Sequence, residues 1–301
     1  SKGETSIIGM PKLPKYSTLI MLNPEREYDI SFNVLSSRIV ENIDIKPNQH
    51  IVNGLEKLLI DDIDEDFYMS EEIYPIQNIS LSDPMVMRDL VVSNLSVIPF
   101  IYNPYKSELE VYESIEITVS EIGITDDRRR REMPKSRVFE KIYQNEIINY
   151  NNNSRDDYQQ SAVLYIYPSS LSSNSSLQDL FEWRRERGYV VYTATTSQTG
   201  SSSSAIKNYI EDAYDDLNPP PEYVTLIGDV GGTYSIPTYY EDYGHDSYGS
   251  DCEGDHPYSQ LDGNDLLPEV LLGRMSIRSS SEITTVVYKI LNYEKATYLD
   301  N

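Results

Sequence analysis

The chain has 301 residues with 49 acidic and 25 basic side chains, which gives a formal net charge of −24 at pH 7. This charge would repel a polyanion, so we exclude nucleic acid as a partner. The length suits two domains, and a hydrophobic content of 39% with 26 Tyr can support packed cores. The single cysteine, Cys252, cannot form an intramolecular disulfide, so cysteine usage does not indicate a compartment.

Two further features bear on the compartment. No apolar run approaches the length of a membrane-spanning helix, so we expect no membrane span. The chain opens at Ser1-Lys2-Gly3, with no initiator Met and no signal-peptide pattern. A processed chain looks like this, so the missing signal leaves the compartment open.

Residues 1–127 have the pattern of an antiparallel β domain. Short segments at 28–34, 90–97, 109–112 and 115–119 alternate apolar and polar residues, and Asn, Pro and Ser separate them. Period-two alternation is typical of half-buried strands with one solvated face. We therefore predict a β-sandwich or jelly-roll-like domain.

Residues 128–160 differ in composition from both flanks and predict a linker. A basic run at Arg128, Arg129, Arg130 and Arg131 comes first, then a short helical stretch at 139–148, then a polar stretch. The four arginines can be a solvated tether. They can also be a cleavage site for a trypsin-like or Arg-specific protease, because exposed linkers are readily cut.

Residues 161–301 alternate strands with helices. Strands are predicted at 162–167, 189–194, 223–227 and 270–272, and helices from about 175 to 187, from 205 to 217 and from 279 onward. This order implies a parallel sheet with right-handed crossovers. The whole chain is therefore predicted to be an α+β multidomain protein, with a mainly parallel α/β domain after the β domain.

The helix boundaries carry their own signals. Ser175 or Ser176 can cap the helix that contains the lone Trp183, and Gly188 can end it. Ser279 and Glu282 have the spacing of a capping box at the start of the last helix.

Carboxylates gather in two predicted loops of the α/β half. Asp229 follows the strand at 223–227, and an acidic segment runs from Asp251 to Glu269. In an open parallel sheet, functional groups gather at the carboxyl ends of the strands. Closely spaced carboxylates repel one another without a cation, and calcium takes about six to eight oxygen ligands. The spacing is not that of an EF-hand, so the residues alone leave a calcium site and a solvated acidic loop as alternatives.

Cys252 could act as a nucleophile with His245 or His256 as its base. The flanking Asp251 and Glu253 would suppress the thiolate, and no oxyanion-hole glycine follows. We interpret Cys252 as an incidental loop cysteine. The sequence also has no phosphate-binding glycine loop and no CxxC pair, so nucleotide and zinc roles are not supported.

Several stretches of the second half resemble one known family. They are LFEWRRERGY at 180–189, PEYVTLIGD at 221–229, Ile236-Pro237, LDGNDLLPEVLLGR at 261–274 and KILNYEK at 289–295. In order and spacing they are similar to the first subdomain of gingipain-type cysteine peptidases. The first half resembles the propeptide of that family through Ile73-Tyr74-Pro75 and Tyr102-Asn103-Pro104-Tyr105.

The resemblance implies a secreted bacterial cysteine endopeptidase, with a propeptide that keeps a caspase-like α/β catalytic domain latent. Residues 1–127 would be the propeptide and residues 161–301 the first α/β subdomain, with processing at Arg128 to Arg131. The catalytic Cys and His would lie beyond residue 301, so we expect no catalytic residue in this chain and no activity from it alone. Its partners would be protein or peptide substrates of the full enzyme and the remainder of the catalytic domain.

The resemblance also implies a structural calcium site in the first subdomain. Matched by motif, its ligands would be the carboxylates of Asp229, Asp265 and Glu269, with backbone oxygens from Asp262 and Leu267.

Two other functions stay open. One is a non-catalytic, calcium-stabilised, secreted or surface interaction module on the same scaffold. The other is a self-sufficient hydrolase that uses Cys252. A downstream His followed by a Cys at strand ends would favour the peptidase over the interaction module.

Overall fold

The computed structural model describes residues 2–49, 62–129, 131–151, 157–241 and 252–295. The chain divides into two compact units. Unit 1 is Ser1–Pro84, Leu90–Arg128 and Ile142–Asn152, and unit 2 is Met85–Asp89, Arg129–Lys141 and Asn153–Asn301. Two short segments of the N-terminal half therefore belong to the unit that the C-terminal half builds.

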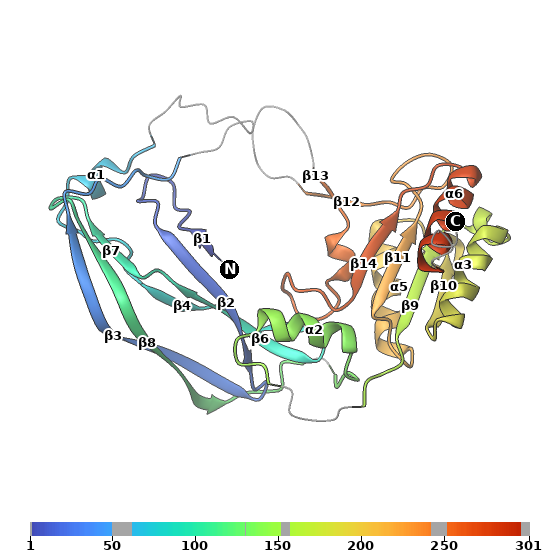
Figure 1. Ribbon diagram of the computed structural model, residues 1–301, viewed down its shortest axis with the longest axis horizontal. Coiled ribbons are helices and arrows are strands. Elements are labelled where there is room, and N and C mark those ends of the chain that lie inside the picture. Colours follow the sequence, from blue (N-terminus) through green and yellow to red (C-terminus); the bar gives the residue numbers. More distant parts are fainter. Residues whose placement is uncertain (1, 50–61, 130, 152–156, 242–251, 296–301) are drawn as a thin grey trace. The chain divides into compact units, whose positions relative to one another are not determined.

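Unit 1 is built on two antiparallel sheets (Figure 1). The larger sheet has the order β1 (Lys2–Glu4), β2 (Pro14–Leu22), β6 (Leu90–Val97) and β4 (Ile79–Leu81). The short strand β5 (Met85–Met87) lies in a segment that belongs to unit 2. The smaller sheet has the order β3 (Arg26–Glu41), β8 (Glu108–Ile124) and β7 (Phe100–Asn103). The predicted antiparallel β architecture is confirmed.

The two sheets share an apolar core. Ile20, Leu22 and Val91 of the larger sheet are buried, and Tyr28 and Val119 of the smaller sheet pack against them. Both sheets therefore contribute side chains to one core, which is the pattern of a β-sandwich.

The short strands predicted at 28–34, 109–112 and 115–119 are parts of two long ones. β3 has 16 residues and β8 has 17, and they pair along almost their whole length. The register shifts on either side of Ser36. Such irregularities absorb an unpaired residue and let the pairing continue, so the interrupted alternation does not end the strands.

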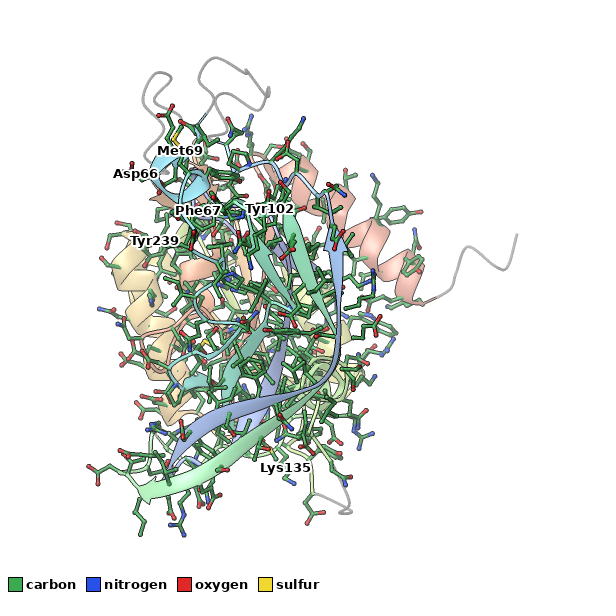
Figure 2. The ribbon with its side chains drawn as sticks, turned by 90° about the vertical axis from the view of Figure 1, so that its left-hand side faces the viewer. Asp66, Phe67, Met69, Tyr102, Lys135 and Tyr239 are labelled. Carbon is green, nitrogen blue, oxygen red and sulfur yellow. The ribbon has the colours of Figure 1, made fainter. Side chains whose placement is uncertain are left out.

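A second apolar cluster in unit 1 surrounds the short helix α1 (Glu65–Tyr68). The side chain of Asp64 caps this helix by accepting the N–H of Phe67. Phe67 packs with Leu13 and Tyr74, while Met69 just past the helix is exposed. Figure 2 shows Phe67 together with Tyr102 of β7, which is also buried. Helix α2 (Arg137–Glu146) comes later in the chain, where the short helical stretch was predicted.

Unit 2 is built on a parallel sheet with the order β10, β9, β11, β14 (Figure 1). These strands are β10 (Val190–Thr195), β9 (Ala162–Tyr167), β11 (Tyr223–Ile227) and β14 (Leu271–Met275). All three pairings are parallel, as predicted. All six residues of β9 are buried, because both faces of this strand are covered.

Helices cover both faces of this sheet. On one face Leu164 and Ile166 of β9 pack with Ile206 and Ile210 of α5. On the other face α3 and α6 pack against the alternate residues of the sheet. The helices of this unit are α3 (Ser175–Glu186), α4 (Thr196–Thr199), α5 (Ser203–Asp216) and α6 (Ser280–Glu294). The remaining elements are the ribbon β12 (Tyr239–Glu241) with β13 (Cys252–Gly254) and the 3₁₀ turns Ser169–Leu171 and His256–Ser259.

The helix ends correct one prediction and confirm others. Asn174, not Ser175 or Ser176, caps α3, because its side chain accepts the N–H of Leu177. Gly188 follows α3 with φ +87°, a conformation that suits glycine at a helix end. Ser279 caps α6 by accepting the N–H of Glu282, as predicted. The Glu282 side chain accepts the N–H of Arg278 and not that of Ser279, so the predicted capping box is only half formed.

In the described ranges, no helix combines the length and the apolar character that crossing a membrane requires.

Candidate functional site

Asp229 lies directly beyond the carboxyl end of β11. Its Oδ1 accepts a hydrogen bond from Ser276 Oγ at 2.6 Å, and Arg278 Nε donates to its Oδ2. The bonds from Ser276 and then Arg278 lower the pKa of Asp229 to about 2. This carboxylate is therefore ionised at neutral pH and already paired at the carboxyl edge of the sheet.

Gly228, one residue earlier, lies where the chain has no room for a side chain. Its φ is +150°, and an added Cβ would lie 2.3 Å from Tyr234 O and 2.8 Å from Ile236 Cγ1. We expect Gly228→Ala to lower the free energy of unfolding by about 2–3 kcal/mol, because backbone atoms would have to move. Gly231→Ala is the matched control, since an added Cβ there meets nothing within 4 Å. Urea unfolding measures both, and equal stability of the two variants would contradict the expected clash.

Arg274 of β14 joins the loop after β11 to the segment before β14. Its guanidinium makes a two-pronged ion pair with Asp255, with Nε–Oδ2 and Nη2–Oδ1 distances of 2.7 Å each. It also donates to Gly228 O at 3.0 Å, Ile236 O at 2.8 Å and Pro237 O at 3.0 Å. Burial acts to raise the pKa of Asp255, but the bonds from Arg274 outweigh it and lower that pKa. The carboxyl edge is thus held by one half-buried arginine.

The acidic segment 262–269 lies at the other edge of the sheet. It precedes β14, and the parallel register pairs Tyr223 with Leu271 and Ile227 with Met275. The N–H of Leu271 donates to Glu222 O, just before β11, so Glu269 and the residues next to it lie at the amino edge. Asp229, which follows Ile227, lies at the carboxyl edge. The structure brings four of the predicted calcium ligands into one loop and separates the fifth. Those in the loop are Asp262, Asp265, Leu267 and Glu269, and the one at the opposite edge is Asp229. Two parallel neighbours send their preceding and following loops to opposite edges, which separates Asp229 from the other four residues of the predicted set. The calcium site itself stays a prediction.

Glu269 is the most unusual group in this loop. Its side chain is fully buried, and its Oε2 accepts the N–H groups of Leu261 at 2.7 Å and Asp262 at 3.2 Å. Its Oε1 is buried without a hydrogen-bond partner among the described residues. Burial raises the pKa of Glu269 to about 8, and the nearby Asp265 and Asp262 act in the same direction. A buried oxygen with excess negative charge around it fits a cation site.

The other carboxylates of the loop are engaged with backbone groups. Asp265 Oδ1 accepts the N–H of Leu267 and its Oδ2 accepts the N–H of Val86, both at 2.8 Å. Asp262 Oδ1 accepts the N–H of Gly263 at 2.8 Å. Within the part of the chain that the structure describes, no three His, Cys, Asp or Glu side chains converge to hold a metal ion. The donor chemistry of the loop suits calcium, while the side chains are oriented toward backbone N–H groups.

Arg88, which the sequence analysis did not single out, is fully buried in unit 2. Its Nη1 donates to Pro221 O at 3.1 Å and to Glu269 O at 3.0 Å, and its Nη2 donates to Gln159 Oε1 at 3.0 Å. The sequence offers one signal for this residue, which is its position directly after the apolar stretch Met85-Val86-Met87. An apolar stretch of this kind is typical of a buried strand, and an arginine at its end can be buried with it.

The Cys252 hypothesis falls largely outside the described residues. Cys252 begins β13, but its side chain lies outside the described part, as does all of His245. His256 is exposed, and its Nε2 lies 2.9 Å from Leu266 O. The imidazole is therefore held by the acidic loop.

The candidate processing residues are not simply solvated. Arg128 Nη1 donates to Arg26 O at 2.9 Å, and Arg131 Nη2 donates to Tyr214 O at 2.7 Å. Arg128, Arg129 and Arg131 are half-buried, and Arg130 lies outside the described residues. Arg128 and Arg131 therefore do not behave as parts of a solvated tether, because each donates a hydrogen bond to a backbone oxygen.

The chain therefore joins a β-sandwich unit to an α/β unit that also includes two segments from earlier in the sequence. Comparison with protein families shows which family has this order. The model of the C25 propeptide matches residues 2–158, and the model of peptidase family C25 matches residues 156–301. The chain belongs to peptidase family C25, with a propeptide region followed by a peptidase region. The two matches meet within the predicted linker at 128–160, near its end.

The curated relatives are gingipains of Porphyromonas gingivalis. Gingipain R2 of strain W83 is 24% identical over 297 residues, which are 95% of this chain and 38% of the relative. A gingipain R1 is 24% identical over 298 residues, covering 95% of this chain and 28% of the relative. A Lys-gingipain is 27% identical over 227 residues, covering 71% of this chain and 12% of the relative. The chain thus spans well under half the length of these relatives.

Two solved structures from the same group are also similar. A complex of the pro- and mature domains of RgpB from P. gingivalis is 25% identical with a TM-score of 0.41, over 50% of this chain and 77% of that chain. The Arg-specific cysteine proteinase gingipain R is 21% identical with a TM-score of 0.38, over 48% of this chain and 30% of that chain.

Proposed function

We propose that this chain is the N-terminal part of a secreted cysteine endopeptidase zymogen that acts on proteins or peptides. The observation that carries the proposal is the order of the two family matches, with the propeptide at 2–158 directly ahead of the peptidase region from 156 onward. A propeptide joined covalently to a peptidase region is the arrangement of a latent precursor, and a cut within 128–160 would separate the two.

The chain contributes scaffold rather than chemistry in this proposal. Cysteine peptidases need a thiolate and an imidazole within hydrogen-bond reach, and we place both in sequence beyond residue 301. The role of residues 161–301 is to form the first part of the parallel sheet. Arg274 and Gly228 fix the loop at its carboxyl edge, where the active sites of such sheets form.

Calcium is part of the proposal, with a smaller ligand set than the sequence alone predicted. The carboxylates of Asp265 and Glu269 and the backbone oxygens of Asp262 and Leu267 would hold the ion. What supports this is the buried Glu269 Oε1, which has no hydrogen-bond partner among the described residues. When bound, calcium would supply positive charge to a loop that otherwise holds three carboxylates together.

Activity of the protein extended to the length of its curated relatives tests the proposal. We expect hydrolysis of protein substrates that iodoacetamide abolishes, because the nucleophile is a thiolate. Cys252→Ala is expected to retain full activity. Loss of activity in that variant would favour a hydrolase based on Cys252. No hydrolysis by the extended, processed protein would favour the non-catalytic interaction module and refute the zymogen.

A further inference from the structure

Arg88 belongs by sequence to the propeptide region and by packing to unit 2. Residues on both sides of Met85–Asp89 belong to unit 1. The groups that accept hydrogen bonds from the guanidinium are Gln159 Oε1, Pro221 O and Glu269 O. All three lie within or after the region where the two family matches meet, so a cut there or at 128–131 leaves donor and acceptors on different fragments.

The environment of Arg88 selects an arginine. Two backbone carbonyl oxygens and one side-chain amide oxygen accept hydrogen bonds from its Nη atoms. The ring centroids of Phe139 and Tyr214 lie 5.2 Å and 5.5 Å from its Cζ. The planar, forked guanidinium can reach several acceptors while it contacts aromatic rings, whereas a lysine ammonium is a single point charge. A Lys side chain at this place would leave buried carbonyl oxygens without donors.

Val86, two residues before Arg88, adds a second contact with the acidic loop. The N–H of Val86 donates to Asp265 Oδ2, and an added Cβ at Gly263 would lie 3.7 Å from Val86 Cγ2. Arg88 itself has φ +55°, a left-handed conformation that is rare outside glycine. The backbone at Arg88 therefore adopts an unfavourable conformation while its side chain lies fully buried among these acceptors.

We propose that Arg88 is the anchor that retains the propeptide fragment on the peptidase region after the linker has been cut. The receiving residues are Gln159, Tyr214, Pro221 and Glu269, and their partner is the Met85–Asp89 segment of the same chain. Binding energy at interfaces concentrates in a few buried contacts that are rich in arginine and aromatic side chains, as this contact is. The inference rests on the proposed zymogen function, since it concerns the state after processing.

The test uses the whole chain, with the recognition sequence of a specific protease placed at residues 154–155 and cleaved after folding. The C-terminal fragment is immobilised, and surface plasmon resonance follows the dissociation of the N-terminal fragment. We expect the unmodified fragments to stay associated, Arg88→Ala to dissociate at least tenfold faster, and Arg88→Lys at least fivefold faster. Arg38→Ala is the matched control, because Arg38 lies on the same fragment with a side chain that is 58% exposed, and its rate should change less than twofold.

Gln159→Ala tests the hydrogen bond between Arg88 and Gln159 from the C-terminal fragment. It removes the acceptor of Nη2, so it should speed dissociation, and its effect should be smaller in an Arg88→Ala background. Circular dichroism of the uncut variants shows whether each folds, and if Arg88→Ala does not, Arg88→Lys and Gln159→Ala decide the matter. Separation of the unmodified fragments, or dissociation of these variants at the unmodified rate, would overturn the anchor. The measurement does not depend on any peptidase activity of this protein, so an inactive extended protein would refute the zymogen without affecting this result.

Discussion

Replacing Arg274 by Ala is expected to lower the free energy of unfolding by about 3–5 kcal/mol, the range found when one partner of a buried ion pair is removed. The side chain of Arg274 is 12% exposed and that of Asp255 is 21% exposed. The change would leave the Asp255 carboxylate with the hydrogen bond from Thr238 but without its ion pair, and would remove the Arg274 donors from three carbonyl oxygens. Urea unfolding at pH 7 measures the loss. Arg185→Ala is the control, because its pair with Glu182 is exposed and should contribute less than about 1 kcal/mol. Equal stability of the two variants would show that the pair does not hold the loop.

The same pair predicts a specific dependence on acid. The pKa of Asp255 is lower in the folded protein than its ordinary value of 3.8. A depressed pKa stabilises the fold above the unfolded value, and this contribution is lost as the pH falls through the folded value. The contribution of Asp255 should therefore be complete above about pH 5 and decline below about pH 4. Asp255→Asn should be less stable at neutral pH and should lack this part of the acid dependence. An unchanged acid profile in the variant would contradict the assignment.

Calcium is expected to stabilise the chain by about 2.7 kcal/mol at a hundredfold excess over its dissociation constant. Titration calorimetry measures binding, and thermal unfolding measures stabilisation. Asp265→Ala and Glu269→Gln should abolish both effects, because each removes a carboxylate from the loop at the amino edge of the sheet. Asp229→Asn should retain them, since Asp229 lies at the opposite edge. Absence of binding at millimolar calcium would contradict the calcium proposal, and loss of binding in Asp229→Asn would contradict the revised ligand set.

The local pattern of the sequence predicted most of the second half. The apolar run at 162–167 indicated a strand covered on both faces, and all of its residues are buried. Gly188 and Ser279 marked helix ends correctly because their backbone and side-chain chemistry is local. The cap at Asn174 was not predicted because two serines follow it, and all three side chains can cap a helix. The preceding 3₁₀ turn at Ser169–Leu171 brings the chain to Asn174 with an extended backbone, which suits a cap.

The candidate site was harder to predict because it depends on direction and on distant contacts. Asp229 and Glu269 each lie beside a strand, but one follows its strand and the other precedes its strand, and parallel pairing then places them at opposite edges. Strand direction carries this information, but the sequence analysis grouped the residues by nearness to a strand and not by the edge at which each lies. Arg88 could not be predicted in this way, because its acceptors are between 71 and 181 residues away in the sequence. No local pattern indicates such a contact.

The most direct test of the central claim follows the extended protein as it matures, by measuring its peptidase activity and the N-terminal sequence of its larger fragment together. The account predicts that the uncut protein is latent and that activity appears with a cut between residues 128 and 160, the predicted linker in which the two family matches meet. Full activity in the uncut protein, or a cut in this region that brings no activity, would contradict it.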